Sequence, residues 1–339
     1  MKLPRCVLLV MLALGMTSTA FARQREPTHA AAQSTDDDEE VVRVSTSLVT
    51  VPVSVSDRQG RFIPDLRRED FHILEDGVEQ EVAFFETADK PFTVALVLDM
   101  SDSARLKSKD IQDAAVAFLG QLRPEDRVLV IAFDSNVNVL TEATGDRARA
   151  EAAIRRAQSG GGTSLYEAVA AATGRRLKAI PGRKAVILFT DGVDTSSKRA
   201  TYESTLRAAE ELDAVVYTIQ YKTDDDVASE FQKTTGQQIV TARGEPLEAA
   251  YKRAGLYMRQ LADGSGGRYY VAGSSGLLAE AFGRIAGELR RQYSLGYYPK
   301  NLSTDGRRRR LKVRVGVPDV SVRTRGGYVY NPGAGPSEK

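Results

Sequence analysis

Two different hydrophobic periods divide the chain. In residues 41–88 and 292–330, apolar and polar positions alternate, as in VVRVSTSLVTVPVSVSD, which is typical of strands with one buried face. In residues 90–290, continuous apolar runs such as TVALVLDM alternate with amphipathic segments such as KSKDIQDAAVAFLGQL. Continuous apolar runs indicate strands buried on both faces of a parallel sheet. The middle region therefore predicts an α/β fold, with a doubly wound, mostly parallel sheet flanked by helices as in Rossmann-like proteins.

The two flanks predict a single small β unit that the α/β region interrupts. Residues 41–88 contain about four strand patterns, with Asp76-Gly77 as a hairpin signal, and residues 292–330 contain three more. Neither half is large enough to form a stable sheet alone. We therefore expect residues 41–88 and 292–330 to pair in a β-sandwich-like unit, with a flexible tail at 331–339.

The first 22 residues have the pattern of a signal peptide. A positively charged start is followed by the apolar run Val7 to Met16 and by the small-residue cleavage signal Ala20-Phe21-Ala22. The apolar run is about half the length of a membrane span. We therefore predict cleavage near Ala22, export to the periplasm or the extracellular space, and no transmembrane span in the mature chain.

Cleavage at this position would also remove Cys6, the only cysteine, and so exclude disulfides and thiolate chemistry from the mature protein. Residues 23–40 are polar and end in the acidic run Asp36 to Glu40, which predicts a disordered leader. The net charge is only +2, so no overall field favours nucleic acid or membranes, and no nucleic-acid partner is expected. The basic run Arg307 to Arg310 lies between two strand patterns. It predicts either a solvated hairpin tip or a contact with an anionic surface.

Three short segments of the α/β region carry oxygen ligands in a metal-binding pattern. VALVLDMSDS provides Asp99, Ser101 and Ser103, GGGTSLYEAV provides Thr163, and AVILFTDGVD provides Asp191. The carboxyl ends of parallel strands meet at one edge of the sheet, so these five side chains should converge. Two carboxylates with three hydroxyls suit a hard divalent cation, with Mg²⁺ expected and Mn²⁺ or Ca²⁺ as alternatives. A helix cap without metal is the other interpretation of Asp-x-Ser-x-Ser.

These segments resemble the von Willebrand factor type A (VWA) domain family over residues 90–290. Its metal-ion-dependent adhesion site follows the pattern Asp-x-Ser-x-Ser, a distant Thr and a distant Asp, and all five positions are present here. Asp102 stands where the family often has glycine. The resemblance implies that the serines and the threonine contact the metal, that the aspartates act through water, and that a partner's carboxylate completes the octahedron. The flanks resemble a bacterial secreted "VWFA-related" family, whose functions are largely unassigned.

The sequence therefore predicts a secreted or periplasmic binding protein that captures an Asp or Glu of a protein partner through its metal. Two alternatives are a structural subunit of an envelope assembly with a vestigial site and a metal-dependent hydrolase. The α/β region contains no histidine or cysteine, so the commonest general bases and nucleophiles are missing and no enzyme is expected. A hydrolase would have to rely on Asp99, Asp102, Asp191 and Asp194. The long polar link 222–247 is expected either to overhang the site and restrict access to it or to be a solvated excursion.

Overall fold

The computed structural model describes residues 48–87, 90–102, 108–221, 240–241 and 244–330. All of these residues belong to one compact unit. The predicted signal peptide, acidic leader and tail, together with Ser103 and most of the 222–247 link, lie outside the described residues. Their predicted properties therefore stay predictions.

A six-stranded sheet forms the centre of the α/β region, with the strand order β10-β9-β8-β5-β6-β7. All neighbouring strands are parallel except β6 and β7, which are antiparallel. The predicted fold class, a doubly wound and mostly parallel sheet, is therefore confirmed. The strands are Phe92–Asp99 (β5), Arg127–Phe133 (β6), Val137–Thr144 (β7), Arg183–Thr190 (β8), Val215–Tyr221 (β9) and Tyr269–Ala272 (β10).

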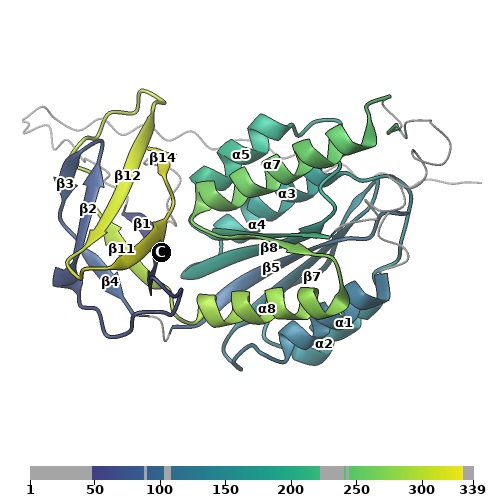
Figure 1. Cartoon of the computed structure of the whole chain (residues 1–339), viewed down its shortest axis with the longest axis horizontal. Coiled ribbons are helices and arrows are strands. Elements are labelled where there is room, and N and C mark those ends of the chain that lie inside the picture. The colour runs from purple at the N-terminus through teal and green to yellow at the C-terminus, as the bar shows by residue number, and fades with distance from the viewer. Residues whose placement is uncertain (1–47, 88–89, 103–107, 222–239, 242–243, 331–339) are drawn as a thin grey trace, which may run out of the picture. The chain divides into compact units, whose positions relative to one another are not determined.

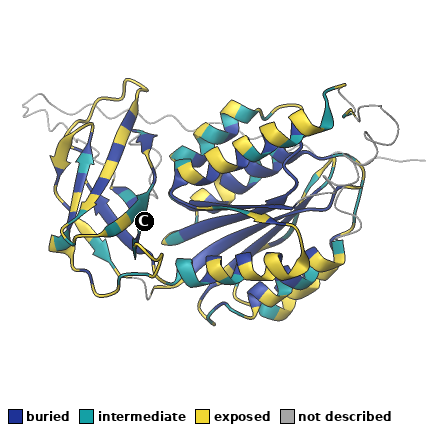
Figure 2. Ribbon diagram, viewed as in Figure 1, coloured by how far each residue is buried: buried dark blue, intermediate teal, exposed yellow. Residues whose placement is uncertain are grey.

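Helices cover both faces of this sheet (Figure 1). One face carries Ser108–Leu119 (α1), Arg147–Arg155 (α2) and Ser275–Leu289 (α8). The other face carries Leu165–Thr173 (α3), Arg175–Lys178 (α4), Tyr202–Glu211 (α5) and Leu247–Ser265 (α7). Alternate residues of β5 enter two separate hydrophobic cores, with Leu96 in the first and Val97 in the second. This explains why the strand reads as a continuous apolar run, and Figure 2 shows the sheet as the most deeply buried layer.

The flanking segments form two four-stranded antiparallel sheets, in the orders β13-β1-β11-β4 and β14-β12-β2-β3. Strands from before and after the α/β region pair directly, because β1 lies between β11 and β13 and β2 pairs with β12. The two sheets share one hydrophobic core. The strands are Val49–Asp57 (β1), Phe71–Glu75 (β2), Val78–Gln80 (β3), Phe84–Glu86 (β4), Tyr293–Tyr297 (β11), Arg308–Val315 (β12), Val320–Thr324 (β13) and Gly327–Val329 (β14). A 3₁₀ turn, Arg68–Asp70, precedes β2.

The basic run at 307–310 is not simply a solvated hairpin tip, so that expectation is wrong for one of its residues. The strand β12 begins at Arg308, and its alternation turns Arg309 into the core, where the residue is 3% exposed. The Arg309 Nη1 atom donates to Glu75 Oε1 at 2.9 Å, and Glu75 is equally buried. The alternation of side chains along β12 therefore buries the charge of Arg309, and the carboxylate of Glu75 on the neighbouring strand balances it.

Further polar contacts complete this buried charge pair. Tyr297 and Tyr328 donate their hydroxyls to Glu75 Oε2 at 2.5 and 2.7 Å. Arg309 also donates to the Asn301 carbonyl at 2.6 Å, and its guanidinium lies 4.5 Å from the centre of the Tyr330 ring. Burial and the hydrogen bond to Glu75 raise the pKa of Tyr297, which keeps the phenol protonated. We call this group, made of Glu75, Tyr297, Arg309 and Tyr328, the charged core of the β unit.

No helix among the described residues is both long and apolar enough to span a bilayer.

Candidate metal site

The strand order places the topological switch point of the sheet between β5 and β8. From β5 the chain proceeds to β6 and β7 on one side, and then returns to β8 on the other side of β5. In open α/β sheets, ligands bind at the carboxyl ends of strands where the direction of winding reverses. Asp99 is the last residue of β5, and Asp191 directly follows the last residue of β8. Both predicted aspartates therefore lie at this switch point, on the rim formed by the carboxyl ends.

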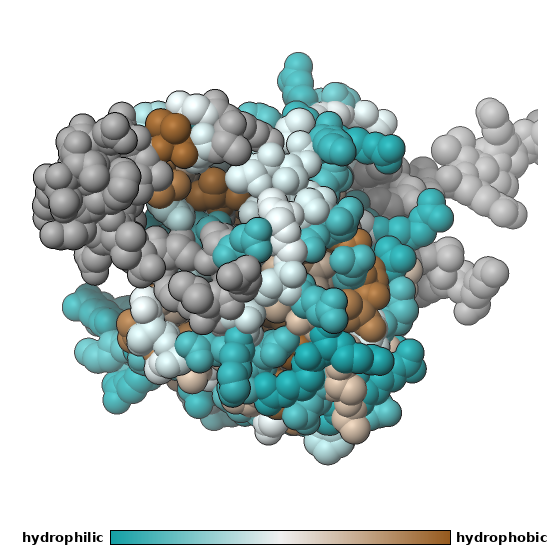
Figure 3. All heavy atoms as spheres, turned by 90° about the vertical axis from the view of Figure 1, so that its right-hand side faces the viewer, coloured by the Kyte–Doolittle hydropathy of each residue, from teal (hydrophilic) through white to brown (hydrophobic). Residues whose placement is uncertain are grey.

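The rim lies on the right-hand side of Figure 1 and faces the viewer in Figure 3. The described part of this surface is mostly hydrophilic, with a few smaller hydrophobic areas.

Asp99 is fully buried and joins the ends of two strands. Its Oδ1 accepts the backbone N–H of Ser101 at 2.9 Å, and its Oδ2 accepts the hydroxyl of Thr190 at 2.5 Å. The same Thr190 oxygen accepts the N–H of Gly192 at 3.0 Å. The turn after β5 and the turn after β8 are thus held together through one carboxylate and one hydroxyl.

Asp191 is held by its own turn and by the next strand of the sheet. Its Oδ1 accepts the N–H of Val193 at 3.0 Å, and its carbonyl accepts Gln220 Nε2 from β9 at 2.8 Å. Gly192 has a φ of 88°, and a Cβ at this position would lie 2.9 Å from the side chains of Ala254 and Met258. The turn therefore requires glycine, which explains the Asp-Gly pair at the end of the apolar run.

The two aspartates influence one another electrostatically. Burial and the negative charge of Asp191 raise the pKa of Asp99 to about 7, against an ordinary value of 3.8. Two neighbouring carboxylates in a site with little water resist ionising together. A divalent cation between them would relieve this repulsion and favour both charged forms.

Ser101 is joined to the segment that contains Thr163. Ser101 forms a parallel β-bridge with Gly160, whose N–H donates to the Met100 carbonyl at 2.9 Å. Three residues later comes Thr163, two residues before α3 begins. Both hydroxyl-bearing residues are almost fully buried, at 1% and 4% exposure.

Thr163 is in turn bonded to the segment that follows Asp191. Its N–H donates to Thr195 Oγ1 at 2.8 Å, and its carbonyl accepts the N–H groups of Thr195 and Ser196 at 2.9 and 3.0 Å. The three motif segments therefore form one hydrogen-bonded assembly at the rim, rather than three separate turns.

The structure brings together four of the five predicted ligands: Asp99, Ser101, Thr163 and Asp191. Ser103 lies outside the described residues. The role of all five as metal ligands stays a prediction. Their chemistry fits a hard cation, because two carboxylates and hydroxyl oxygens would surround it. Nowhere in the described ranges, the rim included, is a group of three or more His, Cys, Asp or Glu side chains placed to hold a metal, so a cation at the rim would depend on hydroxyl oxygens as well.

Sequence reasoning missed the residues that support these side chains. Thr190 orients Asp99, Thr195 positions the backbone of Thr163, and Gln220 fixes the turn at Asp191. The sequence provided a weak indication of a role for Thr190, because it is the one polar residue of the apolar run AVILFT. The sequence provided no indication of a role for Gln220, because that role depends on the pairing of β8 with β9.

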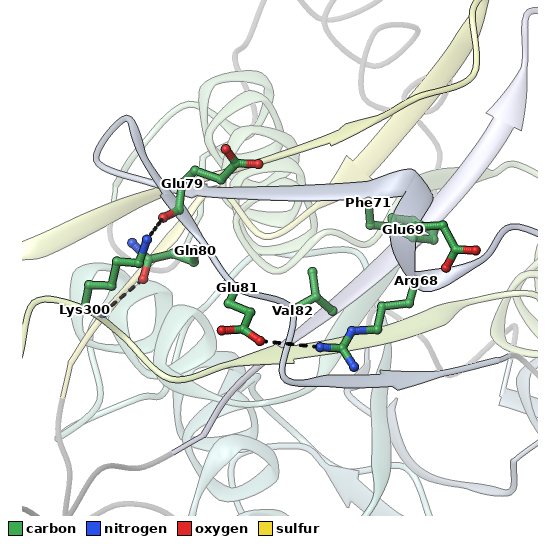
Figure 4. A pocket seen from close by; sticks show the side chains of 8 residues that line it. All are labelled: Arg68, Glu69, Phe71, Glu79, Gln80, Glu81, Val82 and Lys300. Atoms are coloured by element: carbon green, nitrogen blue, oxygen red, sulfur yellow. Dashed lines mark hydrogen bonds and ion pairs between the residues drawn. The ribbon is translucent and has the colours of Figure 1, made fainter.

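A separate hollow of about 560 Å³ lies on the β unit (Figure 4). Its charged side chains interact with their own surroundings, since Lys300 Nζ donates to the Glu79 carbonyl at 2.8 Å and Arg68 lies 3.8 Å from Glu81. The hollow is lined by Arg68, Glu69, Phe71, Glu79, Gln80, Glu81, Val82 and Lys300.

Residues 94–193 match the family model of the von Willebrand factor type A domain. The matched range contains all five predicted metal ligands and extends from within β5 to just beyond the end of β8. The chain therefore contains a von Willebrand factor type A domain, and the resemblance predicted from the motifs is confirmed.

Several solved structures are similar to the chain. The von Willebrand factor type A protein of Catenulispora acidiphila is 14% identical, with a TM-score of 0.47 over 79% of this chain and 76% of that one. The corresponding domain of the type V pili tip protein Mfa5 from Porphyromonas gingivalis is 14% identical, with a TM-score of 0.43 over 58% and 94%. The pilus adhesin SpaC of Lactobacillus rhamnosus GG is 12% identical, with a TM-score of 0.45 over 80% and 42%. Among curated proteins, no match to the sequence is found.

Proposed function

We propose that this protein is a non-enzymatic, exported binding protein that uses a divalent cation at the rim to capture a carboxylate of a protein partner. The observation that carries the proposal is the buried pair Asp99 and Asp191 at the switch point. The hydroxyl-bearing Ser101 and Thr163 lie on segments bonded to the same turns.

The charge balance of this group supports a cation that still needs a ligand. Two carboxylates are enough to attract Mg²⁺, but the remaining positions would be filled by neutral hydroxyl oxygens and water. An ion with so few anionic ligands keeps a strong affinity for an external carboxylate. The partner's Asp or Glu would therefore supply the missing negative charge, as the resemblance to the family also implies.

A binding role agrees with the composition of the α/β region. Residues 90–290 contain no histidine and no cysteine, so histidine general bases and cysteine nucleophiles are missing from this region. The signal-peptide pattern at residues 1–22 supports export, and the partner we propose would then lie outside the cytoplasm.

Selection from random peptides tests the proposal and does not require an identified partner. The chain lacking residues 1–22 is immobilised, a random peptide library displayed on phage is bound in Mg²⁺, and the bound phage are eluted with EDTA. We expect the eluted peptides to share an Asp or Glu. Replacing that residue by Asn or Gln should abolish binding of the synthetic peptide.

Two variants provide the matched comparison. Ser101→Ala removes a predicted ligand and should abolish the Mg²⁺-dependent binding. Ser135→Ala removes an exposed hydroxyl near the same rim and should leave it unchanged. Peptides that bind equally well in EDTA, or that contain no essential carboxylate, would contradict the proposal. Turnover of a phosphoester or peptide substrate would instead favour the hydrolase alternative.

A further inference from the structure

A segment without helix or strand, residues 191–200, connects the rim to the helix α5. It begins at the predicted ligand Asp191 and ends before Thr201, the N-cap of α5. Helices α3 and α5 pack side by side on one face of the sheet (Figure 1). On its way to α5, the segment contacts the N-terminal end of α3, just after the predicted ligand Thr163. Each side of this contact therefore carries one predicted ligand.

The first turn of α3 donates backbone N–H groups to the segment. Amides at the start of a helix have no acceptor within the helix and need one from elsewhere. The N–H of Tyr166 donates to Asp194 Oδ1 at 3.4 Å, and the N–H of Glu167 donates to Ser197 Oγ at 3.2 Å. Side chains of the segment thus supply acceptors for the start of α3.

The Glu167 side chain completes the contact in the opposite direction. Its Oε1 accepts the N–H of Arg199 at 2.7 Å. It also accepts the N–H groups of Lys198 and Ala200, at 3.2 and 3.3 Å. The bond from Arg199, followed by those from the other two amides, lowers the pKa of Glu167 and keeps it ionised at neutral pH. One carboxylate therefore holds three successive amides of a segment that has no helix or strand partners.

The same segment supports Thr163. The N–H groups of Thr195 and Ser196 donate to the Thr163 carbonyl, at 2.9 and 3.0 Å. Gly162 has a φ of 75°, and a Cβ at this position would clash with the Ser196 side chain, so the two backbones approach closely. The segment is therefore attached to the start of α3 at two points, Thr163 and Glu167.

From these contacts we propose that Glu167 is a positioning residue that sets the cation affinity of the rim. Glu167 does not touch the cation. It clamps residues 198–200, which keeps Thr195 against Thr163 and holds the Thr163 and Asp191 segments in one arrangement. This role rests on the proposed function, and adds to it a residue outside the five-ligand pattern. Because such coupling is reciprocal, the bound cation should in turn tighten the clamped segment.

Calorimetric titration of Mg²⁺ into the chain lacking residues 1–22 tests the proposal. Glu167→Ala should raise the Kd about fivefold, below the roughly 10- to 100-fold effect of residues that touch a metal ligand directly. Glu167→Gln keeps an acceptor oxygen without the charge and should lie between Glu167→Ala and the wild type. Glu203 is also a first-turn glutamate, on α5, and is exposed. Glu203→Ala should therefore change the Kd less than about twofold, because it removes only a helix-dipole interaction.

Amide hydrogen exchange, followed by NMR, tests the clamp without a metal. In EDTA, the amides of Arg199 and Ala200 should exchange about tenfold faster in Glu167→Ala than in the wild type, because they lose a charged acceptor. Adding Mg²⁺ to the wild type should slow the exchange of both. Ile73→Val destabilises the core of the β unit instead, and should leave the Kd unchanged. This variant separates the positioning role from a general loss of stability.

Three results would overturn the proposal. Unchanged exchange at Arg199 and Ala200 in Glu167→Ala would show that the carboxylate does not hold the segment. Faster exchange with an unchanged Kd would show that the clamp does not influence the site. An equal rise of the Kd in Glu167→Ala and Ile73→Val would show an effect of stability alone. In all three cases the wild type still binds Mg²⁺, whereas failure of the proposed function would be seen as a wild type that binds no cation.

Discussion

Two buried groups of ionisable side chains, both within the described residues, are built in opposite ways. The charged core of the β unit pairs Glu75 with Arg309 and adds two phenol hydroxyls, so its charges balance within the fold. The rim of the α/β region brings together Asp99 and Asp191, where burial and the negative charge of Asp191 raise the pKa of Asp99 to about 7. A balanced group is complete as it stands, whereas a group with an excess of one sign gains from a ligand of the other sign.

This difference separates a structural role from a binding role. Removing a member of the charged core should damage the fold and leave metal binding unchanged. Removing a member of the rim should abolish metal binding and change the fold less. Four predictions test this contrast, from the largest expected effect to the smallest.

Arg309→Met should reduce the free energy of unfolding by about 3–5 kcal/mol, because it leaves the Glu75 carboxylate buried without its partner. Urea unfolding measures the loss. The neighbouring Arg310→Met removes an exposed guanidinium and should cost less than about 1 kcal/mol. Adding Glu75→Leu to Arg309→Met should recover much of the stability. A loss of the same size in Arg310→Met would contradict the structural role of the buried pair.

Mg²⁺ at 100 times its Kd should stabilise the wild type by about 2.7 kcal/mol, because the ion binds only the folded state. Ser101→Ala should lose this increment, measured by urea unfolding with Mg²⁺ and with EDTA. Arg309→Met, although less stable, should keep it, because the hydrogen bonds of the two groups share no residue and their effects should add. An increment that disappears in both variants would show that the two groups are not independent.

In EDTA, the free energy of unfolding should fall as the pH rises from about 4 to about 7. The folded state raises the pKa of Asp99 from 3.8 to about 7, so the fold favours the neutral carboxyl and is penalised once that group ionises. The slope can reach about 1.4 kcal/mol per pH unit for one proton. Asp99→Asn should remove this decline. Mg²⁺ should oppose it, so that the metal increment grows over the same pH range. A stability that rises with pH through this range in EDTA would contradict the assignment.

Thr190→Val should cost about 1 kcal/mol in EDTA, because it removes the hydroxyl that donates to Asp99 and accepts from Gly192. Thr190→Ser keeps the oxygen and should restore most of the stability. Chemical unfolding measures both changes. Metal affinity should follow the same order, weaker in the valine variant and close to wild type in the serine variant. Equal behaviour of the two variants would show that the methyl group, rather than the hydroxyl, matters at this position.

The sequence predicted the features that depend on local pattern. The order of strands and helices in the α/β region follows from its hydrophobic period. The placement of Asp99 and Asp191 follows from their position after apolar runs, because strand ends of a parallel sheet share one edge. The segment SLYEAVAAATGRRLKA, by contrast, has the period of one helix but forms α3 and α4, because Gly174 between them has extended backbone angles.

Other features depend on contacts between distant segments, and no local pattern contains them. The burial of Arg309 follows from the register that places β12 beside β2, more than 230 residues apart in the chain. The support of Asp99 by Thr190 requires β5 and β8 to be neighbours, which the sequence alone leaves open. The identity of the metal ligands stays a prediction, because a sequence motif identifies the available oxygen atoms but does not show that they bind a cation.

Isothermal titration of Mg²⁺ into the chain lacking residues 1–22 tests the central claim most directly, with Asp191→Asn titrated beside it. We predict saturable binding of one ion per chain in the wild type and none in the variant, whose fold is verified by circular dichroism. No binding of Mg²⁺, Mn²⁺ or Ca²⁺ to the wild type, or equal binding to the variant, would contradict the proposal that Asp99 and Asp191 form a cation site.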